Sequence, residues 1–353
     1  MEPVAIVYHR GISDYDFGVG HPFRGDRFPR FMKLLEDRGL LDRPDVRLVE
    51  PEAAGDEDLL LVHSEDYIRL VERLAEEIAP LSGDTPLRPG VPEAARLIVG
   101  SALRAGDLVV REGFRVAEGV GGGLHHAGRD YGGGFCVFND VAVCARALLD
   151  RYGLDRVLIF DSDVHAGNGT MDIFYEEPRV LFISVHQDPR TIFPGTGFID
   201  QIGGGPGKGY TVNIPLLPGS GDGCMELVLE RVFKPLARAF RPQAIIRNGG
   251  SDPLRRDGLG SLTLTLGGLR SIGEAVSEAA AEAGCGVVDL CCSGYNPETV
   301  AEGWLALLSG VTGIDVELKE GRASSLDGPD LQKATEAVID ALAERLSGFW
   351  SLG

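Results

Sequence analysis

The chain has 353 residues, of which 44% are hydrophobic and 25% are charged, as expected for a globular protein with one large α/β domain or two smaller ones. Its 34 basic and 53 acidic residues give a net charge of −19, which argues against direct nucleic-acid binding and would attract cationic substrates. No N-terminal signal pattern and no apolar run of about 18 residues is visible, so we expect a cytoplasmic protein without a membrane span.

Short apolar runs rich in β-branched residues alternate with longer helical patterns along the chain. Apolar runs without alternation suit strands that are buried on both faces, as in a parallel sheet. The predicted strands are residues 4–8, 156–161, 179–185, 244–248 and 286–292, and the predicted helices are residues 138–153, 225–240 and 266–284. Strands alternating with helices predict an α/β protein, a three-layer αβα sandwich with a mostly parallel sheet.

Two further segments read as surface loops rather than domain boundaries. They are the acidic residues 51–60 and the Pro/Gly-rich residues 79–92. Because no long linker interrupts the pattern, we expect a single domain over residues 1–353.

Polar side chains follow two of the predicted strands, where ligands bind in open parallel sheets. "DSDVHAGNG" places Asp161, Asp163 and His165 at alternate positions, on one side if the chain is still extended, and "GGSDP" presents Asp252 after another strand. Asp163, His165 and Asp252 would give a divalent metal three oxygen and nitrogen ligands and leave a position open for water. Taken alone, the first motif is equally compatible with helix caps or turn residues.

Five motifs occur in a fixed order and are together highly specific. The chain resembles the histone deacetylase superfamily, which includes acetylpolyamine amidohydrolases and acetoin-utilisation deacetylases, and the similarity runs from residue 18 to about residue 310. The resemblance implies the arginase/deacetylase fold, with a parallel sheet of about eight strands. The motifs are "GLHHAG…GGGFCVFND" (123–140), "DSDVHAGNGT" (161–170), "FPGTG" (193–197), "GSDPL" (250–254) and "SGYNP" (293–297).

The resemblance implies that these motifs supply the ligands of a metal centre and a catalytic tyrosine. Asp163, His165 and Asp252 would bind Zn²⁺, or Fe²⁺ as in some members. Tyr295 would polarise the scissile carbonyl; without the motif, a core tyrosine with a satisfied hydroxyl would be the better interpretation.

The same resemblance implies catalytic roles for the adjacent histidines, His125 and His126. Amide hydrolysis needs a base for the attacking water, a donor at the oxyanion and an acid for the leaving amine. His126 would be the base and acid, oriented by Asn168, where some members have Asp. His125 would be oriented by Asp161. A neutral amide stabilises imidazolium less than a carboxylate does, so the two histidines should differ in basicity.

The resemblance also implies substrate-binding and potassium-binding residues. Phe135 and Phe193 would line an apolar tunnel to which Gly134 adds its backbone, although single aromatic residues are more often core. Asp84 would hydrogen-bond the backbone of an acyl-lysine peptide. Structural K⁺ would bind largely through backbone carbonyls, at an inner site of Asp161, Asp163, His165, Ser184 and Val185 and an outer site of Phe174, Val180 and Tyr210.

The sequence departs from the family at several places near these motifs. Ala166 replaces a second histidine, Cys291-Cys292-Ser293 replaces a glycine run before the tyrosine, and Arg255-Arg256 replaces small residues. Leu259 occupies the position of a glutamate gatekeeper in a polyamine-selective member, and an apolar residue there would not select a second ammonium group.

We therefore expect a zinc-dependent amidohydrolase that removes acetyl or short acyl groups from amines, with acyl-lysine in proteins as the favoured substrate. Metal-activated water, a histidine base and a tyrosine donor would carry the reaction. The first alternative is an acetylpolyamine amidohydrolase, which the net charge favours. The second is a non-catalytic sensor of acyl amines that keeps the metal site. A homo-oligomer is compatible with the sequence.

Overall fold

In the part of the chain that the structure describes, eight strands form one sheet in the order β2-β1-β5-β10-β9-β6-β7-β8. The pairs β1–β2, β1–β5, β6–β7, β6–β9 and β7–β8 are parallel. The prediction of an α/β fold with a mostly parallel sheet of about eight strands is confirmed. The strands are β1 (Val4–Val7), β2 (Val46–Val49), β5 (Val116–Val120), β6 (Val157–Asp161), β7 (Val180–Gln187), β8 (Thr211–Leu216), β9 (Ala244–Asn248) and β10 (Gly286–Cys291).

The burial of the strands explains why their sequences do not alternate. Every residue of β1, β5, β6, β7 and β9 is buried. Because successive side chains point to opposite faces of a sheet, both faces of these strands must be covered. This is the burial that the predicted three-layer αβα sandwich requires.

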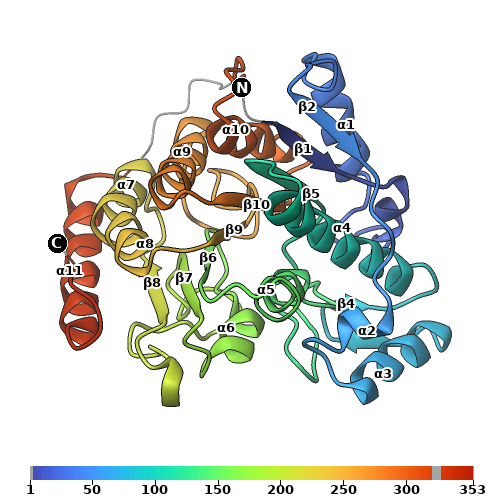
Figure 1. Ribbon diagram of the computed structural model, residues 1–353, viewed down its shortest axis with the longest axis horizontal. Helices are drawn as coiled ribbons and strands as arrows, with labels where there is room; N and C mark the ends of the chain where they lie inside the picture. Colours follow the sequence, from blue (N-terminus) through green and yellow to red (C-terminus); the bar gives the residue numbers. More distant parts are fainter. Residues whose placement is uncertain (1–2, 320–326, 353) are drawn as a thin grey trace. The chain divides into compact units, whose positions relative to one another are not determined.

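The computed structural model describes residues 3–319 and 327–352 (Figure 1). These residues divide into two compact units. Unit 1 contains the described residues up to Leu154, together with Asn168–Ile173 and Val288–Cys292. Unit 2 contains Asp155–Gly167, Phe174–Val287 and the described residues from Ser293 onward. Residues 1–2, 320–326 and 353 of the predicted domain lie outside the described residues, and a single domain over 1–353 stays a prediction.

Helices pack against the strands within each unit. In unit 1, α4 contacts β1 and β5, and in unit 2, α9 contacts β9 and α11 contacts β8. The helices are α1 (Arg27–Asp37), α2 (Asp56–Leu59), α3 (Glu65–Glu76), α4 (Val91–Arg111), α5 (Asp140–Asp150), α6 (Asn168–Phe174), α7 (Asp222–Val228), α8 (Lys234–Phe240), α9 (Leu266–Ala283), α10 (Val300–Thr312) and α11 (Pro329–Leu346). Two 3₁₀ turns, η1 (Arg10–Asp14) and η2 (Gly205–Gly207), and a π-helical segment, η3 (Leu229–Phe233), complete the helical elements of the described residues.

Local signals fix several of the helix ends. The side chain of Asn139 caps α5 by accepting from Ala142 N, and that of Thr265 caps α9 by accepting from Gly268 N. Gly284 ends α9 in the left-handed conformation, which costs glycine little.

The predicted helical stretch of residues 225–240 is helical throughout, with the π-helical η3 between α7 and α8. Two predicted loops need correction. Residues 51–60 contain α2, and residues 79–92 contain a small hairpin of β3 (Pro80–Ser82) and β4 (Thr85–Pro86) before α4 begins. The hairpin is short and Pro-containing, so its composition resembles that of a loop.

No helix of the described residues is both long and apolar enough to cross a membrane.

Candidate metal centre and catalytic residues

The two acidic residues of "DSDVH", Asp161 and Asp163, lie at the end of β6 in unit 2 and just beyond it. Asp161 is the last residue of the strand, and its Oδ1 accepts a hydrogen bond of 3.2 Å from Asp163 N. The chain then bends through residues 163–165, so the condition of an extended chain, under which all three side chains would share one side, is not met. The bend lets Asp163 Oδ1 accept from His165 N at 2.8 Å, which brings these two side chains together.

Asp252 follows β9 and is completely buried. Its Oδ1 accepts hydrogen bonds from the Ser293 hydroxyl at 2.8 Å and from Val164 N at 3.4 Å. The backbones of the two loops touch, because Ser251 N donates to Ser293 O at 3.0 Å. A Cβ atom on Gly250 would lie 2.1 Å from Ser293 O, so only glycine permits this approach.

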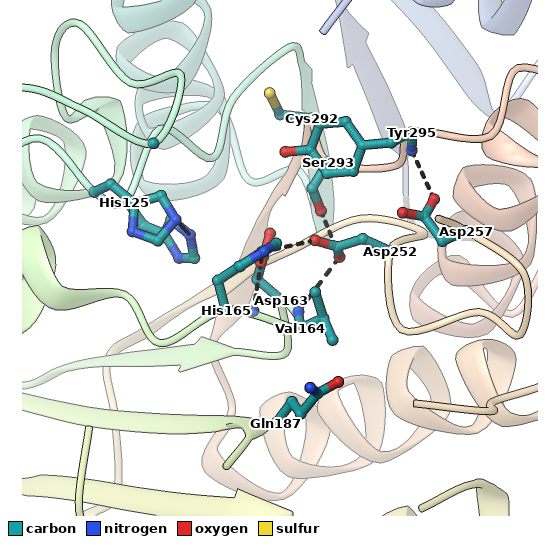
Figure 2. Close-up of polar contacts among 12 residues, drawn as sticks. His125, Asp163, Val164, His165, Gln187, Asp252, Asp257, Cys292, Ser293 and Tyr295 are labelled. Atoms are coloured by element: carbon teal, nitrogen blue, oxygen red, sulfur yellow. Dashed lines mark hydrogen bonds and ion pairs between the residues drawn. The ribbon is translucent and has the colours of Figure 1, made fainter. Parts of the chain in front are cut away.

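The side chains of Asp163, His165 and Asp252 point toward one another (Figure 2), and their potential ligand atoms all lie within 4.8 Å of one another. His165 Nδ1 is 3.0 Å from Asp163 Oδ1 and 3.3 Å from Asp252 Oδ2. Asp252 Oδ2 is buried and makes no hydrogen bond within the described residues. A carboxylate oxygen without a hydrogen bond beside an imidazole nitrogen fits a divalent cation that accepts oxygen and nitrogen ligands.

The charges of this cluster are consistent with a cation site. Burial lowers the pKa of His165, but the hydrogen bond to Asp163 and the charges of Asp163 and Asp252 outweigh it and raise that pKa to about 10. Burial, followed by the charge of Asp163, raises the pKa of Asp252. The cluster therefore retains protons that a bound divalent cation would displace.

The loop that carries Tyr295 is held by residues that the sequence did not single out. Figure 2 shows Asp257 beside the backbone of Tyr295, and its Oδ2 accepts from Tyr295 N at 2.6 Å and from Asn296 N at 3.3 Å. Trp304 Nε1 donates to Ser293 O at 2.7 Å, two residues before Tyr295. Both anchors are buried, whereas Tyr295 itself is partly exposed. An acidic residue five positions after Asp252 was the only sequence signal for Asp257.

The histidine pair belongs to unit 1, as does Asn168 at the start of α6. The Nε2 atoms of His125 and His126 are 3.1 Å apart, and the two ring centroids are 4.1 Å apart. His126 Nδ1 lies 2.7 Å from Asn168 Oδ1, which is the contact that the family resemblance implies. Both histidines are buried. Orientation of His125 by Asp161 stays a prediction.

Asp140 fixes the backbone before the histidine pair. Its carboxylate accepts from Gly123 N at 2.9 Å and from Leu124 N at 2.8 Å. Burial raises the pKa of Asp140 to about 7, although these backbone N–H groups lower it.

Asn139 fixes the backbone of the pair itself and of the residue after it. Its side-chain amide donates to Ala127 O at 2.8 Å and to His125 O at 3.4 Å. Two adjacent polar residues after the buried run "CVF" were the signal for these anchors, which our sequence interpretation missed.

Hydrogen bonds link the predicted substrate residues of unit 1, which are Asp84, Gly134 and Phe135. Both oxygens of Asp84 lie 3.1 Å from Gly134 N, and Asp84 Oδ1 also accepts from the hydroxyls of Ser82 at 2.5 Å and Thr85 at 3.0 Å. Phe135 has a positive φ of 67°, and its backbone N–H donates to Thr85 Oγ1 at 3.0 Å. Asp84 thus holds the turn that carries Phe135, while its binding to a peptide backbone stays a prediction.

The predicted substrate residues of unit 2 are exposed, with 47% of Phe193 and 39% of Leu259 accessible. Nearby in the chain, Arg255 is partly buried and Arg256 is exposed. The residues predicted to bind potassium also belong to unit 2: Ser184 and Val185 lie on β7, Val180 begins β7, Phe174 ends α6, and Tyr210 precedes β8. Their role stays a prediction.

Known proteins resemble this chain over most of its length. Residues 21–311 match the histone deacetylase domain. The chain is 38% identical over 267 residues to a protein named probable deacetylase from Archaeoglobus fulgidus, covering 74% of this chain and 73% of that one. It is 36% identical over 275 residues to acetoin utilization protein AcuC from Bacillus subtilis, covering 75% and 70%.

Among solved structures, the crystal structure of the HDA15 HD domain matches with a TM-score of 0.86 and 25% identity, covering 99% of this chain and 96% of that one. The chain therefore belongs to the histone deacetylase family and is a deacetylase, an enzyme of the hydrolase class.

Proposed function

We propose that this deacetylase is a metal-dependent amidohydrolase that removes acetyl or short acyl groups from amines, with acyl-lysine in proteins as its substrate class. The observation that carries the proposal is the buried cluster of Asp163, His165 and Asp252, in which Asp252 Oδ2 has no hydrogen bond within the described residues. These three side chains would hold Zn²⁺, with Fe²⁺ as the alternative. When bound, the metal would supply a Lewis acid and lower the pKa of water.

His126 would transfer the protons of the reaction, and Tyr295 and His125 would stabilise the charges that develop. His126, with Nδ1 facing Asn168, would accept a proton from the attacking water at Nε2 and then donate it to the departing amine. The hydroxyl of Tyr295 would donate a hydrogen bond to the carbonyl oxygen as negative charge develops there. His125, whose Nε2 is 3.1 Å from that of His126, would stabilise charge beside the base.

Several features support a substrate with one amine group on an alkyl stem. The exposed Leu259 is apolar where a polyamine-selective member of the family has a glutamate, so it would not pair with a second ammonium group. We assign the walls of the alkyl tunnel to Phe135 and Phe193. The net charge of −19 favours polycations instead, but a distributed field acts less selectively than a side chain in the pocket.

A structural K⁺ held mainly by backbone carbonyls is also part of the proposal. Its inner site would include Ser184 and Val185, and its outer site would include Phe174, Val180 and Tyr210.

The test is a substrate panel with the purified protein loaded separately with Zn²⁺ and Fe²⁺. An acetyl-lysine peptide is expected to be hydrolysed with a higher kcat/KM than acetylated putrescine or spermidine, and the reverse order would support the polyamine alternative. Tight binding without hydrolysis of any acyl amide would instead support a sensor.

Two variants test the proposed roles within the same assay. Tyr295→Phe and His126→Ala should each lower kcat by orders of magnitude while the bound metal, measured by elemental analysis, stays unchanged. Near-normal turnover in either variant would refute the role of that residue.

A further inference from the structure

A chain of hydrogen bonds leads from His126 to an exposed carboxylate within unit 1. His126 Nδ1 is 2.7 Å from Asn168 Oδ1, and Asn168 Nδ2 donates to the hydroxyl oxygen of Tyr131 at 3.3 Å. The hydroxyl of Tyr131 then donates to Asp172 Oδ2 at 2.6 Å. His126 is buried, whereas Asp172 is exposed and 40% of Tyr131 is accessible.

The place of Tyr131 in this chain is fixed by its own turn. Gly128 N donates to Tyr131 O at 2.9 Å, which closes residues 128–131. A Cβ atom on Gly128 would lie 2.2 Å from the ring of Tyr131, so the ring rests directly on the backbone of this glycine. Burial of the ring, followed by the hydrogen bond and charge of Asp172, raises the pKa of Tyr131, which therefore remains a hydroxyl donor.

The direction of each hydrogen bond follows from the carboxylate end. An ionised carboxylate only accepts, so the Tyr131 hydroxyl must donate its hydrogen bond to Asp172. The oxygen of Tyr131 is then left as an acceptor, which requires the NH₂ group of Asn168 to face it. The carbonyl oxygen of Asn168 consequently faces His126, whose Nδ1 must carry the hydrogen. His126 Nε2 then carries the lone pair that a general base needs, and His125 Nε2, which is 3.1 Å away, must carry the hydrogen between the two rings.

This orientation matters because residue 168 is an amide. Both oxygens of an aspartate accept hydrogen bonds, so an aspartate at this position would favour the same tautomer whichever way it turned. The two ends of an asparagine side chain differ, and turning it over would present NH₂ to His126 and favour hydrogen on Nε2. An asparagine at this position therefore needs a second residue to orient it.

We propose that Tyr131 and Asp172 are positioning residues that orient the Asn168 amide and thereby set the tautomer of His126. The inference rests on the proposed role of His126 as the base. It identifies two residues that touch no reacting group but control the atom at which the proton is accepted.

The test is ¹⁵N NMR of histidine-labelled protein loaded with Zn²⁺, which is diamagnetic, at a pH where His126 is neutral. The chain has seven histidines, and the signal of His126 is assigned by its loss in His126→Gln. The unsubstituted protein should show hydrogen on Nδ1. Tyr131→Phe and Asp172→Ala, which each remove a group of the hydrogen-bond chain, should both populate the Nε2–H tautomer and lower kcat by about two- to tenfold, the effect of one hydrogen bond, with KM unchanged.

Asn168→Asp provides the matched background, because a carboxylate needs no orienting partner. In that background Tyr131→Phe should change neither the tautomer nor kcat. Asp130→Asn removes a neighbouring exposed charge, whose ion pair with Arg129 is 3.8 Å long, and should behave like the unsubstituted protein.

Two outcomes would overturn the inference: an unchanged His126 tautomer in Tyr131→Phe, or an equal loss of kcat from Tyr131→Phe in the natural sequence and in the Asn168→Asp background. The tautomer shift is measured without any reaction. Its appearance in a protein inactive on every acyl amide would support the positioning role while refuting the proposed function, so the two failures are distinguishable.

Discussion

The hydroxyl of Ser293 donates a hydrogen bond of 2.8 Å to Oδ1 of Asp252, so the loop that carries Tyr295 directly contacts a residue of the candidate metal centre. Ser293 is part of the segment where the family usually has glycines, which offer no side-chain donor. This departure therefore adds an orienting partner to Asp252 and leaves Oδ2 of the same carboxylate facing His165. Residues that hydrogen-bond a metal ligand fix its orientation and influence metal affinity.

Ser293→Ala should lower the affinity for Zn²⁺ by about tenfold or more, because Asp252 Oδ1 loses its hydroxyl donor. Competition with a chromogenic chelator measures the change. Ser271→Ala, at an exposed position of α9, is the control and should leave the affinity unchanged. Equal affinities for Ser293→Ala and the unsubstituted protein would show that the hydroxyl does not support the ligand.

Asp257→Ala should lower kcat by roughly tenfold to a hundredfold, the range expected for loss of a hydrogen bond to a charged group. Asp257 accepts from the backbone of Tyr295 at 2.6 Å, so its removal frees the loop that presents the phenol. Asp257→Asn keeps one acceptor and should be intermediate. The assay is single-turnover hydrolysis with metal content measured in parallel, and Asp315→Ala is a control at an exposed position. A loss explained entirely by lost metal would contradict this role.

His126→Ala should lose far more activity than His125→Ala. The contact with Asn168 prepares His126 to transfer the proton, whereas His125 contributes only charge stabilisation in the proposed mechanism. Measuring kcat for both variants at saturating substrate decides between them. The opposite order of activities would transfer the role of base to His125.

The stability of the protein should fall between pH 7 and pH 5 because of His63. Burial lowers the pKa of His63 to about 4, against the opposing effect of the Arg129 and Gly128 carbonyls. An unfolded histidine titrates near 6.5, so between these values the unfolded chain binds more protons than the folded one. Acidification through this window therefore favours unfolding, by about 2 kcal/mol between pH 7 and pH 5.

Urea denaturation of the protein and of His63→Gln at both pH values measures this contribution. Glutamine does not titrate, and its side-chain oxygen preserves an acceptor for Asn139 N, which donates to His63 Nε2 at 3.0 Å. The difference between the two proteins should shrink at pH 5. A difference that does not depend on pH would show that His63 does not control the acid sensitivity.

The cluster of Asp163, His165 and Asp252 could be predicted because apolar runs mark buried strands and polar residues follow them. The runs before Asp161 and Asp252 correspond to β6 and β9, and strand ends on one sheet edge bring such residues together. By contrast, β5 escaped prediction because its sequence, VAEGV, contains a buried glutamate and a glycine. The short β2 was missed because its side chains are partly exposed.

The supporting contacts could not be predicted in the same way. Tyr131 and Asp172 are 41 residues apart, as are Asp252 and Ser293, and each pair includes at least one residue from an irregular loop. No periodicity of side chains links such residues, since their contact depends on the path of the backbone between them. The family resemblance pointed to Asn168, Tyr295 and the ligands, but not to the residues that hold them.

The missing Cβ of Gly250 also limits how this enzyme can be redesigned. Because the backbone of Gly250 packs against the carbonyl of Ser293, the loop after β9 and the loop after β10 cannot change conformation independently. Exchanging the tyrosine loop for that of a relative would shift the backbone under Asp252 unless residues 249–252 were exchanged with it. Chimaeras should therefore transplant both loops together, and libraries that randomise one of them should keep Gly250 constant.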